Sequence, residues 1–310
     1  MISNLSKNRN LYGMDVNFRE IINLYNLNKL PNKILFSGKR GVGKSTLAHH
    51  IINYILSENE EFRYDLKKLY INKDNKSYRL IINNSHPNYY LIDLINEKKD
   101  IDIGQIRQMF KYVNKSSFNQ LPRFVLIDNI EHLSKSSVNA LLKVVEEPNE
   151  GVFFILIHNS EKRILQTLKS RCLIFNINFS FNHSISIVNR ILKQNVLDLI
   201  NFDLISYYTT PGDLINLVNF AKEKKIDLRD YNLIDFLNLL INNSYYKKDK
   251  FVKNLIINFL ELYLLKRYQL TNTKSSFINL YHIFLEKFKD TEKFNLDEES
   301  LFMELKSKLL

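Results

Sequence analysis

A glycine-rich stretch near the N-terminus has the residue types and spacing that bind phosphate groups. Residues 38–46 read GKRGVGKST, in which Gly38, Gly43, Lys44 and Ser45 satisfy the pattern G-x-x-x-x-G-K-[ST]. Such glycines let backbone N–H groups approach phosphates, and a helix that starts near Lys44 turns its positive dipole end toward them. The Lys44 ammonium would reach the β- and γ-phosphates, and the Ser45 hydroxyl would ligate Mg²⁺. The predicted binding residues for ATP or ADP with Mg²⁺ are Gly38, Lys39, Arg40, Gly41, Val42, Gly43, Lys44, Ser45 and Thr46.

A second stretch, RFVLIDNIEHL, supplies a carboxylate for the same ion. An apolar run ends in Asp128, which would hold Mg²⁺ through water in a P-loop protein. ATP-hydrolysing proteins of this architecture usually place a glutamate next, whereas this chain has Asn129, which cannot act as a base. Loss of a positioned general base costs roughly 10²–10⁴-fold in rate. Glu131 is two residues further on, so we expect nucleotide to be bound and hardly hydrolysed.

The stretch LKSRC, residues 168–172, contains an arginine with two interpretations. Arg171 follows a helical pattern and precedes an apolar run, which places it at an edge of the fold. It could make an ordinary surface salt bridge, and the residues alone favour that reading. It could also be an arginine finger for a neighbouring subunit, a role worth about 10³–10⁵ in rate.

The elements that must position these residues alternate between strand-like and helical patterns. Short apolar runs predict strands at residues 33–37, 89–93, 124–128, 152–157 and 173–177. Amphipathic patterns between them predict helices, which implies a parallel sheet covered on both faces. Ligand sites in such sheets lie at the carboxyl ends of the strands, where the glycine-rich stretch falls. From about residue 185 onward the periodicity is helical throughout.

Composition sets the remaining limits. The 310 residues are 45% apolar and 25% charged, which is ordinary for a soluble globular protein. The net charge of +11 favours a polyanionic partner such as nucleic acid, and a lysine-rich coding bias explains it equally well. Cys172 is the single cysteine, so we expect no disulfide and no zinc site. The stretch MISNLSKNRN does not resemble a signal peptide and no run suits a membrane span, which predicts a cytoplasmic protein without membrane contact.

Several stretches together resemble a known family. The segments SHPNYYLI, FVLIDNIEHLSKSSVNALLKVVEEP and ILIHNSEKRILQTLKSRC are similar to bacterial clamp-loader subunits of the AAA+ family, and most similar to the delta-prime family of DNA polymerase III. The similarity covers about residues 12–225, and the last 85 residues match only in helical character. It implies an α/β P-loop AAA+ domain with a parallel sheet at residues 1–180. An all-α lid at 181–225 and an all-α collar at 226–310 would follow.

The resemblance also implies roles for particular residues. Arg171 matches the arginine that the family presents in trans to ATP bound next door, and Asn159 matches a sensor of the γ-phosphate. Hydrolysing subunits carry an arginine in the lid, where this chain has Gly212 in TTPGDLINL. The four-cysteine zinc module of many relatives is missing, whereas the glycine-rich loop that some delta-prime subunits lack is present.

The function implied by the resemblance is that of a delta-prime-like clamp-loader subunit. It would bind ATP weakly or structurally and act beside gamma/tau and delta subunits while the complex loads the sliding clamp on primed DNA. The chain would belong to the DNA polymerase III holoenzyme, as a poor ATPase and not a polymerase. A gamma/tau-type ATP-hydrolysing subunit is the first alternative, and it needs Glu131 or another acid to activate water. A P-loop kinase or an unrelated nucleotide-binding enzyme is the second, although NALLKVVEEP has no role in it.

Overall fold

The computed structural model divides into two compact units. It describes residues 8–95, 98–115, 119–146, 149–247, 249–270, 274–294 and 296–309. The first unit comprises Met1–Ile191 with Thr210–Leu214, and the second comprises Leu192–Thr209 with Ile215–Leu310. No helix in the described ranges is both long enough and apolar enough to cross a membrane.

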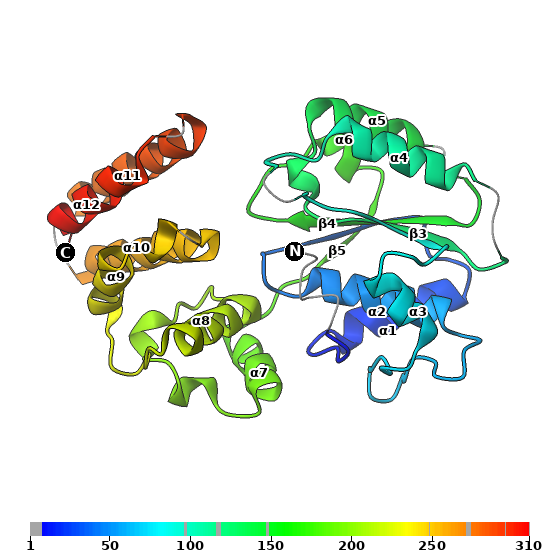
Figure 1. Cartoon of the computed structure of the whole chain (residues 1–310), viewed down its shortest axis with the longest axis horizontal. Coiled ribbons are helices and arrows are strands. Elements are labelled where there is room, and N and C mark those ends of the chain that lie inside the picture. Colours follow the sequence, from blue (N-terminus) through cyan, green and yellow to red (C-terminus); the bar gives the residue numbers. More distant parts are fainter. Residues whose placement is uncertain are drawn as a thin grey trace. The chain divides into compact units, whose positions relative to one another are not determined.

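The first unit is built on a sheet of five parallel strands (Figure 1). The strands are β1 (Lys33–Gly38), β2 (Tyr89–Ile92), β3 (Arg123–Ile127), β4 (Val152–Asn159) and β5 (Leu173–Asn176). Their order across the sheet is β2-β3-β4-β1-β5, and every neighbouring pair is parallel. All five carboxyl ends therefore lie at one edge of the sheet, which confirms the predicted parallel arrangement.

Helices cover both faces of this sheet. They are α1 (Asp15–Asn26), α2 (Lys44–Leu56), α3 (Lys76–Ile82), α4 (Ile103–Val113), α5 (Lys135–Glu146) and α6 (Gln166–Lys169), and α7 (Phe181–Leu192) follows the last strand without covering the sheet (Figure 1). Figure 1 shows α1, α2 and α3 on one face and α4, α5 and α6 on the other. Helix α1 is present in the structure although no helix was predicted there. Pro148, the first proline after α5, lies outside the described residues.

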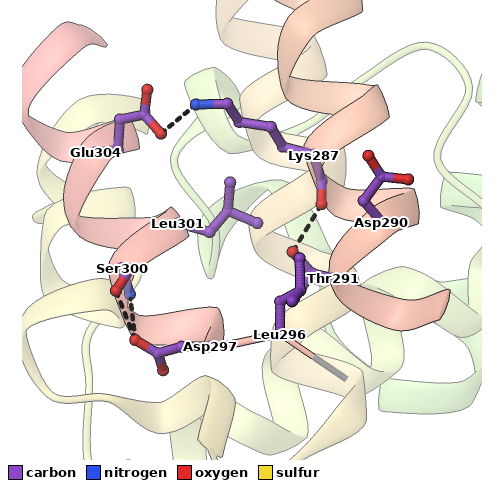
Figure 2. Close-up of a pocket in the computed structure, with 8 residues that line it drawn as sticks. All are labelled: Lys287, Asp290, Thr291, Leu296, Asp297, Ser300, Leu301 and Glu304. Atoms are coloured by element: carbon purple, nitrogen blue, oxygen red, sulfur yellow. Dashed lines mark hydrogen bonds and ion pairs between the residues drawn. The ribbon is translucent and has the colours of Figure 1, made fainter. Parts of the chain in front are cut away.

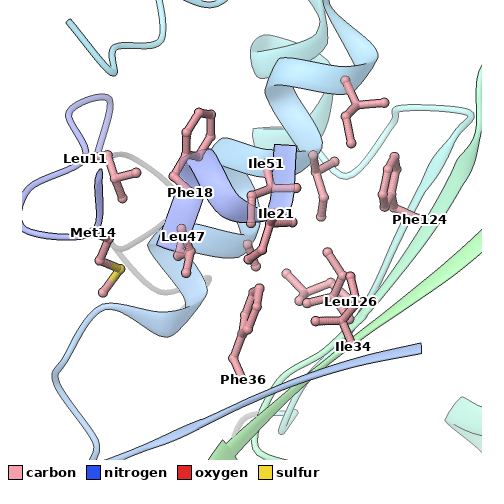
Figure 3. Close-up of a cluster of buried hydrophobic side chains, with 14 of the residues drawn as sticks. Leu11, Met14, Phe18, Ile21, Ile34, Phe36, Leu47, Ile51, Phe124 and Leu126 are labelled. Atoms are coloured by element: carbon pink, nitrogen blue, oxygen red, sulfur yellow. The ribbon is translucent and has the colours of Figure 1, made fainter. Parts of the chain in front are cut away.

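Alternation along the strands produces two hydrophobic cores. Ile34 and Phe36 of β1 pack with Phe18 and Ile51 in the core under α1 and α2 (Figure 3). Leu35, between them in sequence, packs in the other core, under α4 and α5. Burial of each such side chain contributes about 1.5–3 kcal/mol, so the two cores fix the strands that carry the phosphate loop. The fold class of a P-loop α/β domain followed by helical parts is confirmed.

The second unit is helical in the residues described. It contains 3₁₀ turns at Val196–Asp198, Phe202–Leu204 and Tyr245–Lys247, most of α8 (Pro211–Lys224), and α9 (Leu233–Asn242), α10 (Lys250–Leu270), α11 (Lys274–Phe294) and α12 (Glu298–Leu309). A hollow of about 360 Å³ lies between α11 and α12, where Lys287 forms an ion pair with Glu304 (Figure 2). Asp290 and Asp297 also line it, so its charge does not suit a phosphate. The division between lid and collar at residue 225 stays a prediction.

Candidate nucleotide site and exposed arginine

The glycine-rich stretch forms a loop between β1 and α2. Gly38 is the last residue of β1, and α2 begins at Lys44, so a strand precedes the loop and a helix follows it. Gly41 and Gly43 have φ values of +85° and +91°, a region in which a side chain would be strained. The glycines therefore let the chain turn tightly while the first N–H groups of α2 face the loop.

Lys44 occupies the interior of this loop. Its side chain is buried, and its Nζ donates hydrogen bonds to the carbonyl oxygens of Gly38 at 2.8 Å and Lys39 at 2.7 Å. Burial lowers the pKa of Lys44 to about 8, while the negative charges of Asp128 and Glu131 act in the opposite direction. The ammonium thus keeps its charge at neutral pH and is held where a phosphate chain would enter.

Ser45 and Asp128 lie together beside this ammonium. Asp128 directly follows β3, and the Ser45 side chain makes a hydrogen bond with its carboxylate. Burial, helped by the nearby charge of Asp93, raises the pKa of Asp128 to about 6. A hydroxyl and a carboxylate oxygen are ligands that Mg²⁺ prefers, and that ion commonly completes its shell with water and phosphate. The two residues therefore fit the predicted ion, although no cluster of three or more His, Cys, Asp or Glu ligands occurs in the described part of the chain.

The side chain of Asn129 makes a hydrogen bond that the sequence did not predict. Its Nδ2 donates to Asp93 Oδ1 at 2.8 Å, and its backbone N–H donates to Asp128 Oδ1 at 2.8 Å. Asp93 directly follows β2, so this contact joins the ends of two adjacent strands. The available signal was the acidic residue that ends YYLID at the same sheet edge as Asp128.

Glu131 reaches the end of another strand. It lies in the 3₁₀ turn Ile130–His132, and its Oε2 accepts a hydrogen bond from the N–H of Asn159 at 3.1 Å. Asn159 pairs with Gly38 in the sheet, and its Oδ1 accepts from the N–H of Glu161 at 3.2 Å. The structure thus places the predicted sensor residue beside the phosphate loop and directs Glu131 toward the same edge.

The start of α8 contacts the phosphate loop through two glycines. The N–H of Gly212 donates to the carbonyl oxygen of Gly41 at 2.9 Å. A β-carbon on Gly212 would lie 2.6 Å from Gly41 Cα, and one on Gly41 would lie 2.3 Å from Thr210 Oγ1. Thr210 is itself fixed, because its hydroxyl donates to Asp213 Oδ2 at 2.7 Å. An arginine at position 212 could not be accommodated without separating these two backbones.

Arg171 lies far from this loop, at the edge of the sheet that the amino ends of the strands form. It precedes Leu173, which pairs with Ile34 near the start of β1, whereas the phosphate loop follows the end of β1 at Gly38. Gly38 lies four residues after Ile34, or about 13 Å further along the strand. The Arg171 side chain is 36% exposed, so it is not buried in its own core. It donates to the Thr167 carbonyl oxygen and makes the surface salt bridge that the residues alone favoured, with Glu146 as a partner that the sequence did not identify.

Comparison with known proteins identifies similar sequences. The family model described as DNA polymerase III, delta subunit, matches residues 15–180. The DNA polymerase III subunit delta' of Buchnera aphidicola subsp. Baizongia pistaciae is 28% identical over 174 residues, which cover 54% of the chain and 50% of the relative. The subunit of the same name from Buchnera aphidicola subsp. Schizaphis graminum is 25% identical over 287 residues, covering 88% and 83%. The chain thus spans only half the length of the first of these relatives.

Two further proteins are similar to the chain. The DNA polymerase III subunit gamma of Buchnera aphidicola subsp. Schizaphis graminum is 30% identical over 219 residues, covering 69% of the chain and 58% of the relative. A DNA polymerase III gamma-subunit-related protein from Thermotoga maritima has a solved structure with a TM-score of 0.45 and 15% identity, covering 93% of this chain and 97% of that one.

Proposed function

The chain belongs to the DNA polymerase III delta-subunit family whose model matches residues 15–180, and from this membership we propose that it is a delta-prime-like subunit of a clamp loader. Its partners would be ATP-hydrolysing gamma/tau subunits and a delta subunit. The assembled complex would place the sliding clamp on primed DNA during replication. Within it, this chain would bind nucleotide mainly as a structural ligand and supply Arg171 to the ATP site of the neighbouring subunit.

One observation carries this proposal: the phosphate loop lies at the carboxyl ends of the strands, and Arg171 lies at the amino ends of the same sheet. Residues from the carboxyl ends of the strands gather around Lys44, while Arg171 precedes β5 at the amino end. An arginine so placed cannot reach the phosphates bound by its own loop. Its exposure leaves it accessible to a second chain, and a guanidinium there could stabilise charge that develops on a γ-phosphate.

The nucleotide role is inferred from the residues at the carboxyl ends of the strands. Backbone N–H groups of residues 38–46 would hold the phosphates, with Lys44 as the charged donor and Asn159 at the γ-position. Ser45 and Asp128 would hold Mg²⁺, which neutralises phosphate charge when bound. Because Asn129 is hydrogen-bonded to Asp93 and cannot accept a proton from water, we expect slow hydrolysis at this site.

A gamma/tau-type ATP-hydrolysing subunit is the second candidate function, and the position of Glu131 favours it. The carboxylate lies at Asn159, and its charge acts on Lys44. It is therefore an acid near the site that could orient water. Turnover of ATP by the isolated chain, abolished by Glu131→Gln, would support this candidate and exclude a structural role for the nucleotide.

The proposal is tested by reconstituting the complex with gamma/tau and delta subunits and measuring DNA-stimulated ATP hydrolysis. With Arg171→Ala in this chain, turnover at the adjoining site should fall by about 10³-fold or more. Lys169→Ala, which removes an exposed cation two residues away, is the matched control and should have no such effect. Unchanged turnover in a complex that assembles with the Arg171→Ala chain would contradict the trans role.

A further inference from the structure

The guanidinium of Arg171 is held by contacts from two elements. Its Nη1 donates to the carbonyl oxygen of Thr167 in α6 at 2.7 Å. Its Nη2 is 2.8 Å from Oε1 of Glu146, the last residue of α5. One contact uses a backbone atom that cannot rotate away, and the other uses a carboxylate. Together they restrict the side chain to a small set of conformations.

These contacts leave part of the guanidinium available. Arginine has five N–H donors in a planar fork, of which each contact to Thr167 or Glu146 needs one. The Nε–H and a second N–H on each terminal nitrogen can still donate. A phosphate oxygen approaching from solvent could therefore bind to the same guanidinium without displacing either holder.

Two opposite effects of Glu146 must be weighed. Its negative charge offsets part of the positive charge that attracts phosphate, which would weaken the finger. Its hydrogen bond also orients the long Arg171 side chain before a phosphate binds. A free arginine loses rotamer entropy worth about 2 kcal/mol when it is fixed, and an oriented one loses less. The carboxylate is 48% exposed, so water screens its charge, and exposed pairs of this kind contribute only about 0.2–1 kcal/mol. The same weak contact orients the side chain together with the Thr167 carbonyl oxygen, which holds the guanidinium from a second element, so we expect a small orienting effect that exceeds the shielding.

We propose that Glu146 is a positioning residue that orients Arg171 toward the nucleotide of the neighbouring subunit. This inference rests on the proposed function, because it presumes that Arg171 acts in trans. Since the ion pair is weak, Glu146 sets the direction of the side chain without locking it. The effect should therefore be much smaller than that of removing Arg171 itself.

A double-mutant cycle in the reconstituted complex tests this proposal. Glu146→Ala should lower the maximal rate of ATP hydrolysis by about two- to fivefold, with little change in KM. Glu146→Gln keeps an oxygen that can accept from Nη2, so it should retain more of the rate than Glu146→Ala. Glu223→Ala, which removes a carboxylate from another exposed ion pair, is the matched control and should leave the rate unchanged.

The decisive result is the behaviour of Glu146→Ala in a chain that also carries Arg171→Ala. If Glu146 acts through Arg171, the second substitution should cause no further loss. An equal loss in both backgrounds would show a general structural effect, and a faster rate in Glu146→Ala would show shielding; either overturns the proposal. If Arg171→Ala alone has no effect, the proposed function fails, whereas a silent Glu146→Ala beside a strong Arg171→Ala overturns only this inference.

Discussion

The phosphate loop and the Arg171 edge of the first unit handle charge in opposite ways. Lys44 is 6% exposed and bonded to backbone oxygens, and burial lowers its pKa to about 8. Arg171 is 36% exposed and paired with a carboxylate that is itself in contact with water. The first arrangement fixes a charge inside one chain, where a ligand must come to it. The second presents a charge at the surface, where it can reach a ligand bound elsewhere.

The difference shows which properties suit each role. Charges in a buried site interact strongly, so the charge of Asp93 raises the pKa of Asp128 and that of Lys44 lowers it, while Asp128 raises the pKa of Lys44. Charges at the exposed edge interact weakly and are screened by salt. The buried region should therefore respond strongly to pH and to single substitutions, and the exposed edge should respond mainly when another subunit is present.

Acid should produce the largest change, and it should act on the buried region. His50 in α2 is buried; its Nε2–H donates to the Asn8 carbonyl oxygen at 3.0 Å and its Nδ1 accepts from the Tyr64 hydroxyl at 2.8 Å. Burial lowers the pKa of His50 to about 4. The folded-state pKa of His50 lies below the unfolded value of 6.5. The unfolding free energy is therefore at its full value above pH 6.5, and it decreases as the pH falls toward 4 and the unfolded state binds a proton more readily. We expect a loss of up to about 3 kcal/mol.

Denaturant unfolding of the isolated chain between pH 7 and pH 4 measures this loss. His50→Gln can keep a donor and an acceptor but cannot titrate, so it should flatten the pH dependence in part. Some dependence should remain, since burial also lowers the pKa of His49 and His86. An identical pH profile for the wild type and His50→Gln would count against this account of the buried region.

Lys44→Ala should separate the two regions by function. The variant loses a charged donor inside the loop, and we expect this chain's affinity for ATP to fall by about 10- to 100-fold. Calorimetric titration of the isolated chain would measure the change, with Arg171→Ala as the control that leaves affinity unaltered. Most of the turnover of the reconstituted complex should survive Lys44→Ala. Complete loss of turnover would mean that the nucleotide bound here is itself hydrolysed or essential.

Gly212→Ala tests the contact between α8 and the phosphate loop. A β-carbon would meet Gly41 backbone atoms at 2.6–3.2 Å, and we expect a loss of about 1–3 kcal/mol in unfolding free energy. Gly151→Ala provides a comparison, because its β-carbon meets nothing within 4 Å and only its φ of +69° is unfavourable. That variant should lose no more than about 1–2 kcal/mol. A neutral Gly212→Ala would show that the two backbones are not in tight contact.

Removal of the exposed ion pair should produce the smallest effect. Glu146→Ala should change the unfolding free energy of the isolated chain by no more than about 1 kcal/mol. The difference from wild type should shrink further in 1 M salt, a condition under which the Debye length is only about 3 Å. A large, salt-independent destabilisation would indicate that Glu146 is structural, which would also weaken its proposed positioning role.

Much of the first unit could be predicted because its signals are local. The strand–loop–helix around Lys44 follows from glycine spacing and from apolar runs of strand length. Helix α1 carried a readable signal as well, since Phe18, Ile21, Ile22 and Tyr25 repeat at helical spacing, although the sequence analysis did not assign it. Local patterns thus determine the elements and place Asp128 and Asn159 at strand ends.

The contacts of the site could not be predicted in the same way. Asn129 meets Asp93 and Glu131 meets Asn159 only because their strands end at one edge of the sheet. The approach of Gly212 to Gly41 likewise depends on where α8 begins relative to β1. Such pairs are set by the tertiary packing of segments far apart in sequence, so a residue pattern can name the candidates without showing which of them touch.

The most direct test determines which subunit binds the nucleotide that lies next to residue 171. Arg171→Cys, placed in the reconstituted complex, would be exposed to an ATP analogue with a thiol-reactive group on its γ-phosphate. The unsubstituted chain is the control, since burial raises the pKa of its half-buried Cys172 to about 11 and should keep that thiol unreactive. We predict labelling of this chain only within the complex, lost when the phosphate-loop lysine of the neighbour is replaced and retained with Lys44→Ala. Labelling of the isolated chain that disappears with Lys44→Ala would contradict the account.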